Sequence, residues 1–172
     1  MEIISYILSL IATVLGIIEP FNKKMTGVLI FSLVGNLIVG TSYFLVKAVS
    51  GGVICSIACV QLLINYFYNA KGKKIPNWLR AIYIVSFVAV NLIAFAHWYD
   101  ALALAASIMF VLSVSQSNTL FYRIFFMSNS LLWIVYDIVA NAYGNLSTHI
   151  ILFSATLIST FVRNRKNKIK DL

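Results

Sequence analysis

Two asparagines stand in the middle of long apolar runs, where an amide side chain is costly unless it is hydrogen-bonded. Asn36 lies within FSLVGNLIVGTSYFLVKAVSGG (residues 31–52), and Asn129 lies within IFFMSNSLLWIVYDIVANAYGN (124–145). An amide both donates and accepts hydrogen bonds, so at membrane depth it either joins neighbouring helices or binds a polar solute. The residues alone leave both interpretations open.

The two runs repeat one another at an offset of 93 residues, which pairs Asn36 with Asn129. The spacing of Asn, then Tyr seven residues on, then Gly eight further is the same in both runs. This offset predicts an internal repeat that puts the two amides at equivalent places near the bilayer midplane. The other identical pairs are Tyr43/Tyr136, Val46/Val139, Gly51/Gly144, Ala12/Ala105, Thr26/Thr119 and Ile57/Ile150.

Aromatic side chains follow each asparagine along its predicted helix. Tyr43 and Tyr136 come two helical turns later, about 10 Å towards the outside, where they line a vestibule or belong to the interfacial aromatic belt. Trp133 falls on the same stripe as Asn129, and Gly40 takes its place in the first repeat. A Trp opposite a Gly predicts a gap that a planar or ring-bearing solute fills.

Glu19 and Asp137 are the acids nearest to membrane depth, where ionisable groups are candidate functional sites. We expect gating or proton-linked roles for Glu19, Pro20 and His149, since His is the group that titrates near neutral pH. The alternatives are solvation at the interface for both acids, with Lys23 as a partner of Glu19, and a packing role for His149.

Gln61 and Asn65 add a polar stripe to the run at 52–69, and we count them with Asn36, Asn129, Trp133, Tyr43, Tyr136 and Asp137 as candidate substrate-binding residues. Cys55 and Cys59 are too few for a zinc site. There is no HExxH, GxSxG or P-loop sequence. We therefore expect a protein that is not an enzyme and that holds no metal or cofactor.

The composition identifies the elements that must position these residues. Hydrophobic residues make up 61% of the 172 positions, charged residues 10%, and the mean hydropathy is +0.93. The apolar runs approach the roughly 20 residues with which a helix crosses a bilayer, and they are too continuous for the strands of a membrane barrel. The chain is predicted to be an all-α membrane protein. Its net charge of +8 is better explained by orientation than by nucleic acid.

Seven transmembrane helices are predicted between breaks such as EPFNKK (19–24), SGG (50–52) and NAKGKKIPNW (69–78). HWYD (97–100) is the softest break, and a six-span alternative would need one re-entrant run. The predicted spans are 3–19, 26–46, 52–69, 80–98, 100–114, 119–141 and 146–163.

The distribution of basic residues distinguishes the seven-span model from the six-span model. With seven spans and the N-terminus outside, 12 of the 13 Lys and Arg residues fall on the inner side, and Lys47 is the exception. Because inner loops of membrane proteins are enriched in Lys and Arg, an N-out/C-in orientation is predicted.

The offset of 93 residues aligns the first three spans with the last three. A single helix between two three-helix units makes them parallel, so the prediction is a 3+1+3 plan. Its parts are a first repeat at 1–70, a cytoplasmic loop and linker helix at 71–98, a second repeat at 99–164 and a basic cytoplasmic tail at 165–172.

The segments GNLIVGTSYFL (35–45) and SNSLLWIVYDIVANAYG (128–144), followed by a last helix that runs into a basic tail, resemble the YgjV family of bacterial inner membrane proteins. The 3+1+3 plan is also similar to that of the SWEET and PnuC transporters. That resemblance implies a facilitator, but the SWEET proline appears only as Pro20, with Ser113 at the paired position. PnuC-like tryptophan-rich motifs are absent, so sugar specificity is not supported.

We therefore expect a multi-pass protein of the bacterial inner membrane that moves a small polar or aromatic solute by alternating access around a midplane site. Its expected partners are membrane lipids and that solute, without nucleic acid, and a homo-oligomer is left open. The alternative is a non-transporting scaffold or partner-binding subunit whose asparagines lock helices together.

Overall fold

The computed structural model describes residues 2–45, 49–93, 95, 97–140 and 143–170. Within these helices the side chains at 2–3, 5–6, 43, 49–51, 143–145 and 164–170 lie outside the description. The regular structure of the described residues is entirely helical. The elements are α1 (Glu2–Ile18), the 3₁₀ turn η1 (Glu19–Phe21), α2 (Met25–Leu45), α3 (Val49–Ala70), α4 (Asn77–Ile93), α5 (Asp100–Val114), α6 (Thr119–Val139) and α7 (Tyr143–Lys170).

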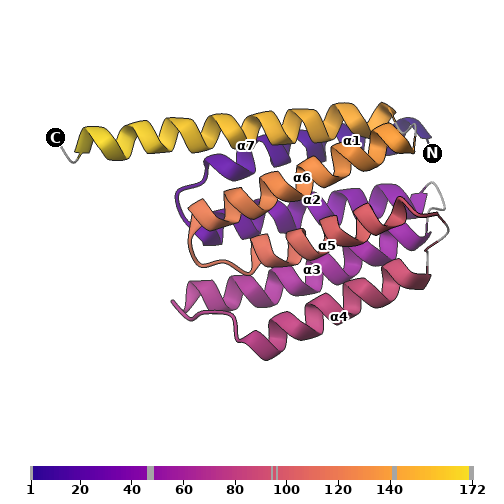
Figure 1. The fold of residues 1–172 in the computed structure, drawn as a ribbon, viewed down its shortest axis with the longest axis horizontal. Helices are drawn as coiled ribbons and strands as arrows, with labels where there is room; N and C mark the ends of the chain where they lie inside the picture. Colours follow the sequence, from indigo (N-terminus) through magenta and orange to yellow (C-terminus); the bar gives the residue numbers. More distant parts are fainter. Residues whose placement is uncertain (1, 46–48, 94, 96, 141–142, 171–172) are drawn as a thin grey trace.

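The helices lie along one common direction in two layers, with α4 to α7 in front and α1 to α3 behind (Figure 1). Each helix contacts the next one in the chain, and α1 also contacts α7. The two ends of the chain lie at opposite ends of the bundle, and α1, α3, α5 and α7 all point the same way. The connections α1–α2 and α3–α4 share the end at which α7 finishes.

Local sequence explains where several helices begin and end. Pro20 lacks the N–H that would continue α1, and the chain tightens there into η1. Gly72, at φ +64°, ends α3 in the left-handed conformation that glycine adopts without strain. Asn118 caps α6 by accepting a 2.8 Å hydrogen bond from the Leu120 backbone N–H.

Two apolar clusters hold the layers together. In one, Val28 and Leu29 of α2 pack with Leu62 of α3 and with Tyr122 and Phe126 of α6. In the other, Tyr83 and Phe87 of α4 pack with Val111 of α5 and Ala58 of α3. The outward faces of the helices carry many exposed Leu, Ile, Val and Phe side chains. Such faces are expected where lipid replaces water as the surrounding solvent.

Three described helices are long and apolar enough to cross a membrane, over Met25–Ser42, Gly52–Ala70 and Leu146–Arg163. Shorter apolar helices cover Ile7–Phe21, Asn77–Ile93 and Asp100–Val114. The prediction of an all-helical protein with seven helices is confirmed by the element order. That all seven cross the membrane stays a prediction.

One predicted boundary is wrong. The fourth helix ends at Ile93 rather than at 98, and a turn follows in which Asp100 accepts a 2.7 Å hydrogen bond from the His97 backbone N–H. The predicted span 146–163 agrees with the apolar stretch Leu146–Arg163, and α7 continues beyond it to Lys170, so most of the basic tail is helical. Lys and Arg are good helix formers, and they prolong a helix that has already left the apolar region.

Candidate functional site

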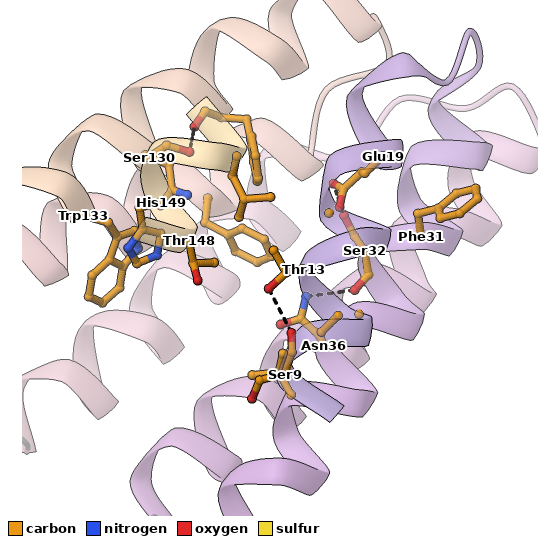
Figure 2. Close-up of a pocket in the computed structure, with 18 residues that line it drawn as sticks. Ser9, Thr13, Glu19, Phe31, Ser32, Asn36, Ser130, Trp133, Thr148 and His149 are labelled. Carbon is orange, nitrogen blue, oxygen red and sulfur yellow. Dashed lines mark hydrogen bonds between the residues drawn. The ribbon is translucent and has the colours of Figure 1, made fainter. Parts of the chain in front are cut away.

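A cavity of about 370 Å³ lies between α1, α2, α6 and α7, with one side chain from α5, Phe110 (Figure 2). Asn36 and Asn129 both line it, so the two amides that the sequence singled out meet in one space. The residues around them are Ser9, Ala12, Thr13, Gly16, Glu19, Phe31, Ser32, Gly35, Val39, Phe126, Ser130, Trp133, Thr148, His149 and Leu152.

The two amides retain hydrogen-bonding capacity. Asn36 Nδ2 donates 2.9 Å to the Ser32 carbonyl one turn earlier in its own helix, and therefore does not join α2 to a neighbour. The Asn129 side chain is 7% exposed, and its Oδ1 is buried without a partner among the described residues. A buried acceptor without a partner is costly, and this cost falls on a side chain that lines the cavity.

Hydroxyl groups from four helices complete the polar lining. Thr13 Oγ1 donates 2.9 Å to the Ser9 carbonyl, and Ser130 Oγ donates 3.0 Å to the Phe126 carbonyl. A hydroxyl that donates in this way keeps lone pairs free to accept a further bond. Ser9 Oγ also lies 3.3 Å from Ser42 Oγ, which links α1 to α2.

One wall of the cavity is aromatic. The rings of Trp133 and His149 stack with centroids 5.5 Å apart and an interplanar angle of 12°. They come from α6 and α7, and they face the α1 and α2 side chains across the cavity in Figure 2. His149 Nδ1 lies 2.7 Å from Asp137 Oδ2. Asp137 is 1% exposed, so its solvation at the interface is ruled out and His149 is its partner.

Glu19 closes the far side of the cavity. Its Oε1 accepts hydrogen bonds from the hydroxyls of Ser32 and Tyr122, which brings together η1, α2 and α6. Glu19 is 5% exposed and forms no ion pair with any Lys or Arg of the described residues. The expectations of a solvated Glu19 and of a Glu19–Lys23 pair are therefore wrong. Pro20 ends α1 before the i+4 geometry with Lys23 is reached.

Behind Glu19, side chains of α6 and α7 hold the α1–α2 connection in place. Arg123 Nε donates 2.9 Å to the Pro20 carbonyl, and Ser159 Oγ donates 2.6 Å to the same oxygen. Arg123 and Arg163 also reach the Asn22 carbonyl, each at 3.4 Å. Pro20 is thus part of a closed, hydrogen-bonded end of the bundle.

Gln61 and Asn65, two predicted substrate-binding residues, lie elsewhere. Asn65 Nδ2 donates 2.9 Å to the Val114 carbonyl, and Gln61 Nε2 donates 3.5 Å to the Val111 carbonyl. Both are fully buried between α3 and α5 and do not line the cavity. Asn65 thus pairs the Val114 carbonyl at the end of α5, whereas the Val111 carbonyl that Gln61 approaches also accepts a 3.2 Å hydrogen bond from the Ser115 backbone N–H.

The predicted gap between Trp133 and Gly40 and the predicted positions of Tyr136 and Tyr43 have different outcomes. Trp133 lines the cavity, but Gly40 does not, because a Cβ there would lie 3.0 Å from Cys55 Cβ at the α2–α3 contact. Tyr136 packs edge-on against Tyr99 and Trp133 at 5.6 and 5.3 Å, outside the cavity lining. The side chain of Tyr43 lies outside the described residues.

The sequence interpretation missed Tyr122, Ser32 and the hydroxyls of the cavity. One signal was present, since Ser9, Thr13 and Gly16 follow the i, i+4, i+7 spacing of one helix face. Arg123 was interpreted only as an orienting charge. Its bond to Pro20 joins positions 103 residues apart, a contact that no local pattern encodes.

A family model for a bacterial inner membrane protein, Imp-YgjV, matches residues 3–168. No curated protein and no solved structure matches the chain. The family match covers nearly the whole chain, and the apolar helices agree with a membrane location. The chain therefore belongs to the Imp-YgjV family of bacterial inner membrane proteins.

Proposed function

We propose that this protein is a small-solute transporter of the inner membrane and that the cavity between α1, α2, α6 and α7 is its solute site. The observation that carries this proposal is the Asn129 amide, which lines the cavity, is 7% exposed and leaves its Oδ1 without a partner among the described residues. Gln61 Oε1 and Asn65 Oδ1 are also unpaired among the described residues, but these two side chains donate across the α3–α5 contact and lie outside the cavity, whereas Asn129 donates to no neighbouring helix of the described residues and lines it.

The scaffold alternative requires both asparagines to bind neighbouring helices in a dry contact. Asn91 is an amide of that kind: it donates 2.8 Å to the Phe87 carbonyl and 3.2 Å to Ser107 Oγ, and so connects α4 to α5. Asn36 bonds only within its own helix, and Asn129 makes no hydrogen bond through its side chain with the described residues. The contrast favours a solute role for the cavity pair.

The solute we propose is small, polar and ring-bearing. A cavity of about 370 Å³ lies within the range of small-molecule sites. The Trp133 and His149 rings supply a flat stacking surface, and the amides and hydroxyls fix its orientation. We propose that α1–α3 and α5–α7 are parallel repeats that alternate access to this site. The common direction of α1 and α5, of α2 and α6, and of α3 and α7 supports this plan.

Ligand-induced stabilisation of the purified full chain in lipid nanodiscs tests the site. A panel of small polar solutes with planar rings is screened for a raised Tm, because a solute that binds only the folded state stabilises it. Two variants alter the cavity: Asn129→Leu removes the unpaired amide, and Gly35→Leu fills space, because a Cβ at Gly35 meets no atom within 4 Å. Asn91→Leu is the matched control outside the cavity.

We expect at least one solute to bind the wild type and the control, and to bind both cavity variants at least about tenfold more weakly. The same solute should then enter proteoliposomes that contain the wild-type protein and not those that contain Asn129→Leu. A panel without any binder, or a binder that is equally tight on Asn129→Leu and Gly35→Leu, would overturn the proposal.

A further inference from the structure

We propose that Glu19 binds the ammonium group of a small organic cation and that this cation and a proton compete for the same carboxyl. This inference rests on the proposed function, since it names the solute class for the same cavity. In this proposal Glu19 makes the cavity prefer cationic solutes over neutral ones.

The geometry around Glu19 leaves one oxygen for a ligand. Oε1 accepts both the Ser32 and the Tyr122 hydroxyls, whereas Oε2 accepts no hydrogen bond from the described residues. Oε2 is also absent from the fully buried unpaired atoms, and Glu19 lines the cavity. The free oxygen therefore has access to the cavity.

The positive groups near Glu19 are engaged elsewhere. Arg123 of α6 and Arg163 of α7 donate to the backbone carbonyls of Pro20, Asn22 and Lys23. Among the described residues, no Lys or Arg lines the cavity. Several titratable or charged side chains surround Glu19, namely Lys23 and Lys24 of the loop after η1, Tyr122 and Arg123 of α6, and Arg163 of α7. The His149–Asp137 pair lies at the other end of the cavity. The described side chains of α1, and those of α2 that pack on η1, include no further titratable or charged group.

A carboxyl that is removed from water without a positive partner either holds a proton or binds a cation, because an isolated buried charge is too costly. An ammonium group brings three N–H donors and a full positive charge. One donor meets Oε2, and the hydroxyl oxygens of the cavity lining are further acceptors. When the cation binds, the O–H bond of the Glu19 carboxylic acid breaks, the carboxylate pairs with the ammonium and the proton passes to water.

Benzylamine and benzyl alcohol form a suitable probe pair, because they share a ring and differ in charge. Calorimetric titration of the full chain in nanodiscs is run from about pH 6 to about pH 8, where an ammonium stays protonated. Two buffers with different ionisation enthalpies report the protons released for each molecule bound. Glu19→Gln keeps an oxygen for Ser32 and Tyr122 but removes the acid. Asp100→Asn removes another carboxylate that does not line the cavity.

We expect benzylamine to bind at least about tenfold tighter than benzyl alcohol. Its affinity should rise by up to about tenfold per pH unit as one proton is released. Glu19→Gln should abolish both the preference and the proton release, and Asp100→Asn should keep them. Equal binding of the two probes, binding without proton release in the wild type, or an unchanged preference in Glu19→Gln would overturn the inference.

The wild-type proton count does not depend on any variant folding, so a misfolded Glu19→Gln protein leaves the inference falsifiable. Neutral ring-bearing solutes could bind the wild type and not Asn129→Leu, while benzylamine binds no tighter than benzyl alcohol. In that case the inference about Glu19 fails and the proposed solute site stands. If neither these probes nor the wider panel binds, both fail.

Discussion

Asp137 Oδ2 lies 2.7 Å from His149 Nδ1, and this contact joins α6 to α7 beside the aromatic wall of the cavity. Asp137 is 1% exposed and His149 is 23% exposed, so the carboxyl depends on the imidazole for its hydrogen bond. The same imidazole is stacked on Trp133. One pair thus fixes both the packing of two helices and the position of the surface against which a ring would lie.

We expect His149→Ala to lower the free energy of unfolding by about 1–3 kcal/mol, because a buried carboxyl loses its partner. In an Asp137→Asn background the same change should cost less, since a neutral amide is easier to bury than an acid. Denaturant titration of the four proteins in micelles measures this coupling. Thr148→Ala, at a neighbouring position in the same cavity, is the control. An equal cost in both backgrounds would show that the pair is not coupled.

Arg123 is expected to be essential for holding the α1–α2 connection. Arg123→Leu removes donors from the Pro20 and Asn22 carbonyls and should destabilise the protein by about 2 kcal/mol or more, because hydrogen bonds from charged donors are the stronger class. Arg80→Leu is the matched control, since Arg80 Nε has no hydrogen-bond partner among the described residues. Similar Tm losses for the two variants would show that the hydrogen bonds of Arg123 do not hold the α1–α2 connection.

The sequence was sufficient for the number and order of the helices, because the length of apolar runs is a local property. It was not sufficient for Glu19. Whether Glu19 faces solvent or the bundle depends on the tight turn at Pro20 and on Tyr122, which is 103 residues away. Gln61 and Asn65 show the same limit, because a polar stripe on one helix does not reveal which neighbouring helix supplies its hydrogen-bond partners.

Asn65→Leu and Asn129→Leu should have opposite effects. Asn65 donates to the Val114 carbonyl between α3 and α5, so its loss should lower stability by about 0.6–1.7 kcal/mol and leave solute binding intact. The Asn129 side chain makes no hydrogen bond with the described residues, so its replacement should cost little stability. Because Asn129 lines the cavity, the same replacement should abolish solute binding. Parallel thermal unfolding and ligand titration compare the two. Loss of solute binding in Asn65→Leu would mean that the α3–α5 contact belongs to the site.

The orientation is expected to be N-out/C-in, because the α1–α2 and α3–α4 connections and the end of α7 share one end of the bundle and carry most of the Lys and Arg residues. Single cysteines at 47 and 167 in a Cys55→Ala/Cys59→Ala background report it. In intact cells an impermeant thiol reagent should label position 47 and reach position 167 only after permeabilisation. Labelling of position 167 from outside would reverse the assignment.

Two glycines of α2 should respond oppositely to alanine. A Cβ at Gly35 meets no atom within 4 Å and points into open space, whereas a Cβ at Gly40 would lie 3.0 Å from Cys55 Cβ. Alanine loses less backbone entropy in a helix, so Gly35→Ala should stabilise the protein by up to about 1 kcal/mol. Gly40→Ala should destabilise it, because Cys55 Cβ is attached directly to the α3 backbone and the two helices would have to move apart.

Thermal unfolding of both variants separates close packing from open space on the same helix. If Gly40→Ala unfolds at the wild-type temperature, the α2–α3 contact is looser than 3.0 Å implies. If Gly35→Ala loses stability, the space beside Gly35 is filled, and the cavity on which the solute site depends is smaller than about 370 Å³. A stable Gly35→Ala protein that still binds solute, beside a Gly35→Leu protein that does not, would place the solute against this face of α2.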